Sequence, residues 1–175
     1  MFTRVKVYNY LDIKNYLSAP EKVDITMNNS IFDIFDDDPN DTIGEAVTPA
    51  GDHLFQVNEE DHISLYDKEV ADVHHIMARL LFLCKPARRY LQTDVAFLCM
   101  RVQNPDTDDY NTLSRTLTYL CTTAGLPFIL GMDGTNTVSW WVDGKFSIHN
   151  DMKIHTGAYM SLGIGAAYAS SSKNN

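Results

Sequence analysis

The sequence predicts an α+β protein, in which a unit of short helices precedes a small antiparallel sheet. Helical periodicity of apolar residues recurs three times between Glu69 and Gly125, whereas β-forming residues and glycine turns dominate after Pro127. Residues 18–65, by contrast, are rich in acids and poor in periodic apolar positions. These observations divide the chain into four expected parts: 1–17, 18–65, 66–125 and 126–175.

The N-terminal segment 1–17 is expected to form a short helix or a strand. Four of its apolar residues lie roughly on one side if the segment is helical: Val7, Tyr10, Leu11 and Leu17. Pro20 then interrupts regular structure.

The segment 18–65 is expected to be an acidic, largely disordered linker. Residues 18–50 hold eight acids and one lysine, which leaves too little apolar surface to offset the entropy lost on ordering. A calcium loop beginning at Asp36 is the alternative, but it needs glycine at its sixth position and glutamate at its twelfth. Those positions hold Asp41 and Val47, so the sequence favours the linker.

Three amphipathic helices are expected in the helical unit. The first begins at Glu69 and the second covers about Leu91–Val102, with a proline between them that ends the first helix. The third follows Asn104-Pro105-Asp106, where the aspartate is a suitable N-cap, and Gly125 is expected to cap its C-terminus. Such brief connections predict antiparallel packing of the helices.

Residues 126–175 are expected to form a meander of about three antiparallel strands. β-Forming runs occur at four places: Phe128–Gly131, Thr137–Gly144, Thr156–Gly163 and Gly165–Ser171. The run Gly163-Ile164-Gly165 predicts a tight hairpin between the last two. Because no helix follows to cover the sheet, we expect a truncated sheet with an exposed apolar face.

Composition excludes several classes of protein. Hydrophobic residues make up 45% of the 175 residues, which excludes a wholly disordered chain. No apolar run approaches the ~20 residues that cross a bilayer, and the N-terminus lacks the pattern of a secretion signal. The three cysteines have no metal-ligand spacing and indicate reduced core thiols. We therefore expect an intracellular protein, cytoplasmic or nuclear, with no membrane partner.

The net charge of −9 is concentrated in one part of the chain. Residues 1–17 have a net charge of +2, residues 18–72 of −13, and residues 73–175 of +2. Overall acidity argues against non-specific binding of nucleic acid, although this argument is weaker for the nearly neutral C-terminal part.

Asp143 is the residue best suited to chemistry, because it ends a Trp-Trp-Val strand beside a glycine. A carboxylate at such a strand end can reach a metal ion above the sheet. The alternative is a turn aspartate that binds its own backbone. Asp151 is the one acid that follows, and two-metal phosphodiester chemistry needs several converging carboxylates.

Other polar residues indicate no site. His149 and His155 are expected to be exposed or locally bonded, and the run Ser170-Ser171-Ser172 is expected to have no partner base. Neither a phosphate-binding glycine loop nor a nucleophile elbow is present in the sequence. Four arginines form either a modest basic face or ordinary helix surface: Arg88, Arg89, Arg101 and Arg115.

Six segments in fixed order carry a family resemblance: Val47–Phe55, His74–Lys85, Asp94–Leu98 with Asn104–Asp106, Tyr119–Leu120, Trp140–Gly144 and Asp151–Gly157. Together they resemble the polymerase polyprotein of copia-type LTR retrotransposons, downstream of its reverse transcriptase catalytic centre. The resemblance implies that residues 66–125 form a thumb-like or connection-like unit. Residues 126–175 would then be the first strands of an incomplete ribonuclease H fold.

By this resemblance, Asp143 corresponds to the first metal-binding aspartate of ribonuclease H. The parent element performs RNA-directed DNA synthesis and RNA-strand degradation during transposition, with Mg²⁺ and an RNA–DNA hybrid as partner. The polymerase aspartate pair and the ribonuclease H glutamate are missing here, and Ala87–Leu91 departs from the family pattern. We therefore expect Asp143 to remain as the single carboxylate of the catalytic, metal-binding set, to bind metal weakly and to support no catalysis alone. The protein is expected to bind no cofactor tightly, to bind nucleic acid weakly or not at all, and to self-associate.

Two other interpretations stay open. In the first, the chain is a non-enzymatic protein-binding module that uses the helical unit and the acidic linker. In the second, it is the product of an open reading frame without a selected function. Genomic context separates them, because flanking polymerase or integrase sequences favour the fragment.

Overall fold

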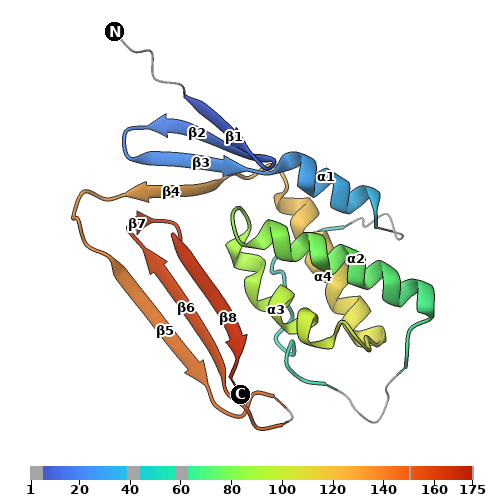
Figure 1. Cartoon of the computed structure of the whole chain (residues 1–175). Helices are drawn as coiled ribbons and strands as arrows, with labels where there is room; N and C mark the ends of the chain where they lie inside the picture. The colour runs from blue at the N-terminus through green and yellow to red at the C-terminus, as the bar shows by residue number, and fades with distance from the viewer. Residues whose placement is uncertain (1–5, 39–43, 58–62, 150, 175) are drawn as a thin grey trace.

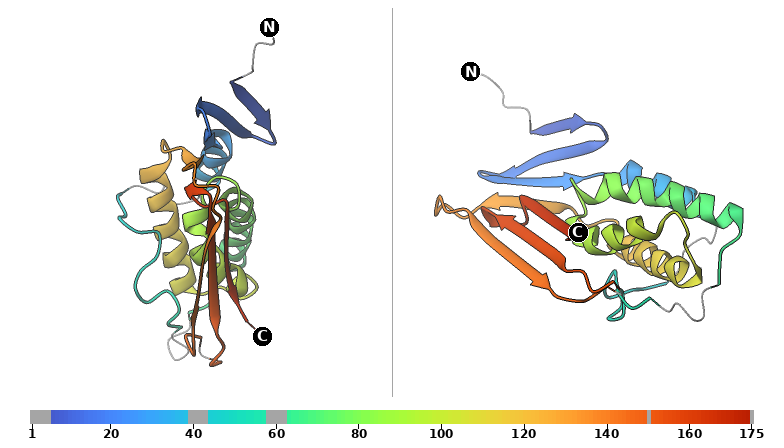
Figure 2. Two further views of the ribbon diagram at one scale, coloured as in Figure 1. Left: turned by 90° about the vertical axis from the view of Figure 1, so that its left-hand side faces the viewer. Right: turned by 60° about the horizontal axis from the view of Figure 1, so that its bottom comes forward.

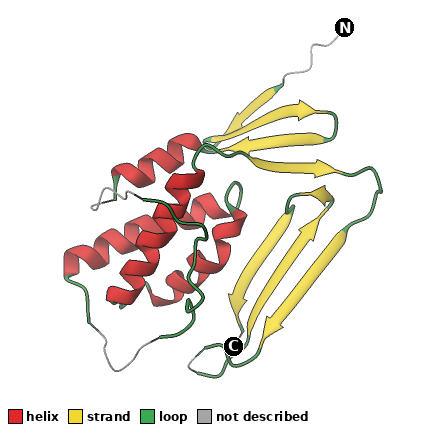
Figure 3. Cartoon of the chain, turned by 180° about the vertical axis from the view of Figure 1, so that it is seen from behind, coloured by secondary structure: helices red, strands yellow, loops and turns green. Residues whose placement is uncertain are grey.

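The helices pack into one cluster, and the strands form two antiparallel sheets beside it (Figure 1). This computed structural model describes residues 6–38, 44–57, 63–149 and 151–174. The expected α+β class is confirmed, with helices α1 to α4 and an antiparallel order in both sheets. Seen from behind, the helices and the strands occupy separate halves of the molecule (Figure 3).

The N-terminal segment forms strands, which was one of its two expected states. Strands β1 (Val7–Tyr10) and β2 (Ile13–Ala19) are joined by a two-residue turn. Both turn residues, Leu11 and Asp12, have positive φ, as a tight hairpin with right-handed twist requires. The turn therefore excludes a helix over this segment.

The disordered linker predicted for 18–65 is wrong over residues 22–38. This part forms strand β3 (Lys22–Thr26) and helix α1 (Asn28–Asp36). Its few apolar side chains are enough to anchor it, since Ile31 and Ile34 are spaced for one helix face and are fully buried. The expected disorder over 39–43 and 58–62, including the acidic run around Asp41, lies outside the described residues.

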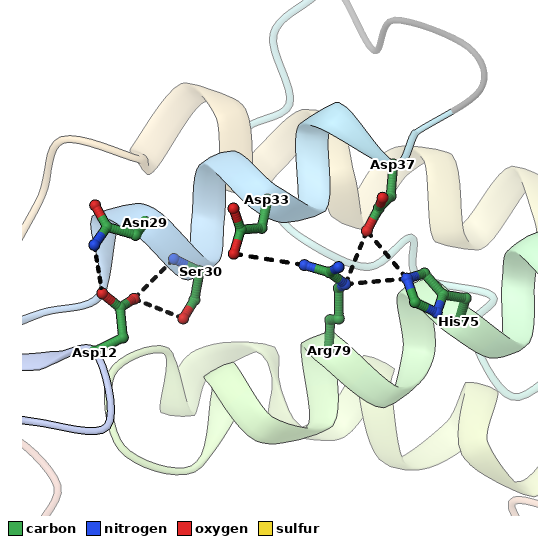
Figure 4. Close-up of polar contacts among 7 residues, drawn as sticks. All are labelled: Asp12, Asn29, Ser30, Asp33, Asp37, His75 and Arg79. Atoms are coloured by element: carbon green, nitrogen blue, oxygen red, sulfur yellow. Dashed lines mark hydrogen bonds and ion pairs between the residues drawn. The ribbon is translucent and has the colours of Figure 1, made fainter.

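The acids of α1 are held by partners rather than by water alone (Figure 4). Asp33 and Asp37, one turn apart, both form ion pairs with the guanidinium of Arg79 on α2, at 3.6 and 2.8 Å. Asp37 also lies 3.1 Å from His75 Nε2. At the other end of α1, Asp12 accepts from Ser30 N at 2.8 Å. Composition alone missed this pairing because the partners lie about 20 or more positions away.

The three predicted helices are confirmed as α2 (Asp67–Cys84), α3 (Gln92–Arg101) and α4 (Thr107–Thr123), with a short 3₁₀ turn at Arg89–Leu91. The predicted N-cap is also confirmed, because Asp106 accepts from the backbone of Asp108 and Asp109 at 3.0 and 2.9 Å. Ala124, not Gly125, caps the C-terminus of α4.

One apolar core lies between these helices and the first sheet. Its fully buried side chains come from all four helices and the 3₁₀ turn, among them Ile34, Leu80, Leu91, Val95 and Leu120. Ile25 of β3 joins the core from the sheet. The acidic N-terminal part and the helical unit are therefore packed together rather than linked by a tether.

The first sheet has the order β1-β2-β3-β4-β7. Strand β4 (Phe128–Met132) pairs with β3 on one side and with β7 (Gly163–Ile164) on the other. The tight hairpin predicted at Gly163-Ile164-Gly165 is wrong, because these residues leave the meander to reach β4. Gly165, at φ 73°, is required there, since a Cβ would lie 2.0 Å from the carbonyl oxygen of Ile129.

The second sheet is the predicted three-stranded antiparallel meander. It consists of β5 (Ser139–Lys145), β6 (His155–Ser161) and β8 (Tyr168–Lys173), in that order. Strand β8 lies nearest to α3 and β5 farthest from the helices (Figures 1 and 2). No helix within the described residues is long and apolar enough to span a bilayer.

Candidate functional site

The register of the second sheet divides its side chains into two faces. Paired residues share a face, and alternate residues point to opposite faces. The inner face carries Trp141, Asp143, His155, Tyr159 and Ser171. This face turns toward α3, because the ring of Phe55 bridges His155, at 4.8 Å, and Phe97 of α3, at 5.4 Å.

Asp143 lies inside strand β5, not at its end. The ladder continues through Gly144 to Lys145, so the predicted strand-end position beside a glycine turn is wrong. The carboxylate is exposed, and its Oδ1 accepts from the backbone N–H of Gly144 at 2.9 Å. This is the local backbone bond that the alternative interpretation of Asp143 anticipates.

A pocket of about 640 Å³ opens in front of Asp143. The sheet lines it with Trp141, Tyr159 and Ser171, and the segment that begins α3 contributes Arg89 and Gln92. The rings of Trp141 and Tyr159 pack edge to face at 5.3 Å. The pocket therefore offers both aromatic rings and hydrogen-bonding groups.

Asp151 does not join Asp143 in this pocket. Its Oδ2 lies 2.8 Å from Nζ of Lys173 and 3.7 Å from Nζ of Lys153. The hydrogen bond from Lys173 lowers the pKa of Asp151 and outweighs partial desolvation. Among the residues whose positions are given, no group of three or more His, Cys, Asp or Glu side chains could hold a metal ion. The residues present therefore do not fit a two-metal centre.

Two histidines and one serine form a hydrogen-bonded chain that the sequence analysis missed. His149 Nε2 lies 3.1 Å from His155 Nδ1, and His155 Nε2 lies 2.6 Å from Ser171 Oγ. Both histidines are buried, at 7% and 8% exposure, so the exposed state expected for them is wrong and the alternative, a local hydrogen bond, is the one found. The serine run does have a base beside it, which comes from the neighbouring strand. The sequence signal was the alternation of side chains between the two faces of β6 and β8. This alternation identifies His155 and Ser171 as neighbours only once the register of the two strands is known.

Burial sets the charge of the two histidines. Desolvation lowers the pKa of His149, with the charge of Lys173 adding to the effect and Asp151 opposing it. Desolvation and the neighbouring His149 lower the pKa of His155. Both rings are therefore neutral at neutral pH, which leaves one ring nitrogen of each as a hydrogen-bond acceptor.

The arginines do not form a shared basic face. Arg88 is buried and donates to the carbonyl oxygens of Ala87 and Ala124, both at 3.0 Å. Arg101 pairs with Asp106 and Asp109. These contacts occupy the guanidinium of Arg88 and neutralise that of Arg101, so neither of these two residues offers a free cation to a phosphate backbone.

No protein-family model, no curated protein and no solved structure matches this chain.

Proposed function

We propose that the chain is a segment of a copia-type reverse transcriptase and ribonuclease H polyprotein, and that it does not cleave RNA by itself. The observation that carries the proposal is the second sheet. Three strands of residues 126–175 pair in the order β5-β6-β8 to form an antiparallel meander, and Asp143 lies on the first of them. A unit of three helices precedes them, as the resemblance implies.

The absence of activity follows from the carboxylates that can reach one point. Hydrolysis of a phosphodiester by two Mg²⁺ ions needs several oxygen ligands around both ions. Asp143 supplies one carboxylate, and one of its oxygens already accepts from Gly144. Asp151 is bound to Lys173. Cleavage would therefore need carboxylates from a second chain or from further parts of the polyprotein.

The test is a labelled RNA–DNA hybrid incubated with the protein and Mg²⁺ or Mn²⁺. We expect no cleavage above background, and the same result for Asp143→Asn. A second arm adds the remaining strands and helices of a ribonuclease H domain in trans, where cleavage should appear with wild type and not with Asp143→Asn. Metal-dependent cleavage by the wild-type chain alone, lost in Asp143→Asn, would overturn the proposed inactivity.

A protein-binding module is the second candidate function, and a specific surface favours it. The outer face of the second sheet, opposite the inner face, exposes Trp140 and Val142 at 56% and 68% and Tyr168 at 46%. Apolar side chains gathered on one face are typical of an interface. The acidic linker gives this candidate less support, because Asp33 and Asp37 are paired with Arg79.

A further inference from the structure

We propose that Ser171 is the nucleophile of a metal-independent acyl-transfer site, with His155 as its general base and His149 as a positioning residue. The site takes aryl esters of small carboxylic acids. It is separate from phosphodiester chemistry, because it uses no carboxylate ligand and no metal ion. The proposal rests on the hydrogen-bonded chain and on the pocket in front of it.

The chain of hydrogen bonds has one consistent assignment of protons for nucleophilic attack. Ser171 Oγ donates to His155 Nε2, which makes Nε2 the acceptor and places the ring proton on Nδ1. His155 Nδ1–H then donates to Nε2 of His149 at 3.1 Å. A nucleophile held by a base, whose ring is in turn oriented by a third group, is the arrangement that activates serine.

The groups around His155 keep its ring neutral, which is the state that a general base needs. The ring of Phe55 packs against both histidines, at 5.3 Å from His149 and 4.8 Å from His155. Both rings are buried and stay neutral, so Nε2 of His155 keeps its lone pair for the proton of Ser171. Ser171 itself is only partly buried, so a substrate can reach its Oγ.

The pocket defines the class of substrate. Ser171 shares its wall with the rings of Trp141 and Tyr159, which suit a flat aromatic leaving group. Arg89 lines the same pocket. A guanidinium cation in the wall favours a substrate whose carbonyl oxygen gains negative charge during the reaction.

The reaction balances without a further reactant except water. Ser171 Oγ forms a bond to the ester carbonyl carbon, and its proton passes to Nε2 of His155. The carbon–oxygen bond to the aryl group breaks, and that proton leaves with the aryl alcohol. Water, deprotonated by His155, then attacks the acyl-serine, releasing the carboxylic acid and restoring Ser171.

The test uses the folded chain with a fluorophosphonate probe and p-nitrophenyl acetate, both with a metal chelator present. The probe should form a bond from Ser171 Oγ to phosphorus with release of fluoride, and mass spectrometry should locate it on Ser171. Ser171→Ala should abolish labelling and ester hydrolysis. His155→Gln should slow both by about 100-fold or more, the usual contribution of a general base.

A matched control lies on the same strand. Ser172 follows Ser171 on the opposite face of the strand and does not line the pocket, so Ser172→Ala should label like wild type. His149→Leu should slow labelling, and His149→Gln, which keeps an acceptor near the position of Nε2, should restore most of the rate. A merely structural histidine would show no such rescue.

Labelling of folded and urea-unfolded wild type keeps the test decisive even if a histidine variant does not fold. A folded-state rate on Ser171 at least 100-fold above the unfolded rate supports the proposal. Equal rates in the two states, or a folded His155→Gln variant that labels like wild type, would overturn it.

Discussion

At the scale of single residues, this protein places several polar groups where water cannot reach them. Arg88 is 1% exposed, and it ties the segment before α3 to the C-terminal end of α4 through Ala124. Asp94, in the first turn of α3, is 2% exposed, and its Oδ2 has no hydrogen-bond partner among the described residues. Such a carboxylate weakens the fold when it is charged, because desolvation is not repaid by a partner.

Asp94 should make stability depend on pH. Burial raises the pKa of Asp94 from its ordinary 3.8 to about 7, with the charge of Arg115 opposing the rise. Between these two values the folded state binds more protons than the unfolded state, so the free energy of unfolding falls as the pH rises. Asp94→Asn should therefore stabilise the protein at pH 8 by about 2 to 4 kcal/mol and have little effect at pH 4.

Urea unfolding of wild type and Asp94→Asn at pH 4, 6 and 8 measures this difference. Comparing the variant with wild type at each pH removes the contribution of other titrating groups. Asp52→Asn, which neutralises an exposed acid, is the control and should show no such trend. A constant difference across the three pH values would contradict the prediction.

At the scale of elements, polar contacts decide which parts of the acidic segment fold. Helix α1 has only two fully buried apolar side chains, Ile31 and Ile34. Polar contacts at its two ends stabilise it further (Figure 4). Asp12 of the β1–β2 turn accepts a hydrogen bond from Ser30 at the start of α1, and Arg79 of α2 forms an ion pair with Asp37 at its end. An isolated helix of nine residues would be unstable in water, so these tertiary contacts are needed.

Removal of the Asp12 carboxylate should destabilise α1. Asp12 accepts from Ser30 N and Asn29 Nδ2 at 2.8 Å and from Ser30 Oγ at 2.7 Å. Partial desolvation opposes the shift, but these hydrogen bonds prevail and lower the pKa of Asp12. Asp12→Gly accommodates the positive φ of 64° while deleting the carboxylate. We expect a loss of about 1 to 2 kcal/mol, as for the loss of a helix cap.

Leu11→Gly is the matched control, because Leu11 is the other positive-φ residue of the same turn and is largely exposed. Chemical unfolding should show no loss of stability for Leu11→Gly. Amide exchange across α1 should accelerate in Asp12→Gly alone. Equal effects of the two substitutions would show that the backbone, and not the carboxylate, determines the result.

At the scale of the whole molecule, the second sheet lies beside the helices with one edge near them and the other edge away from them (Figures 1 and 2). Strand β8 packs against α3, whereas β5 forms an outer edge with mostly exposed residues. The rings of Trp140 and Tyr168 lie 5.7 Å apart on the outer face. An open strand edge next to exposed aromatic rings favours pairing with another chain.

We predict concentration-dependent self-association through this outer face. Val142→Lys places a charge next to Trp140 on the same face of β5. It should shift the protein toward monomer, by about tenfold or more in the dissociation constant, since each 1.4 kcal/mol of lost contact is tenfold. Sedimentation velocity across a range of concentrations measures the shift. Val47→Lys introduces the same charge at a valine that is 92% exposed and should leave association unchanged. A wild-type chain that remains monomeric at high concentration would contradict the prediction.

Local sequence was sufficient for the parts of the fold that local physics controls. The period of apolar residues determined the three long helices, and Asp106 determined where α4 begins, because a cap acts within three residues. The three strands of the second sheet were also evident from β-forming runs. The overestimated disorder came from composition, which records the number of acids and not the position of Arg79.

Tertiary structure alone decided the pairings between distant residues. Strand β3 pairs with β4, which lies about one hundred residues later in the chain, and β7 also pairs with β4. The local sequences of β3 and β7 do not indicate that β4 is their partner. The same holds for the candidate sites. Asp143 and Asp151 are close in sequence, yet a salt bridge to Lys173 keeps Asp151 apart. Ser171 and His155 are 16 positions apart, and they meet because the antiparallel register of β6 and β8 places them on one face.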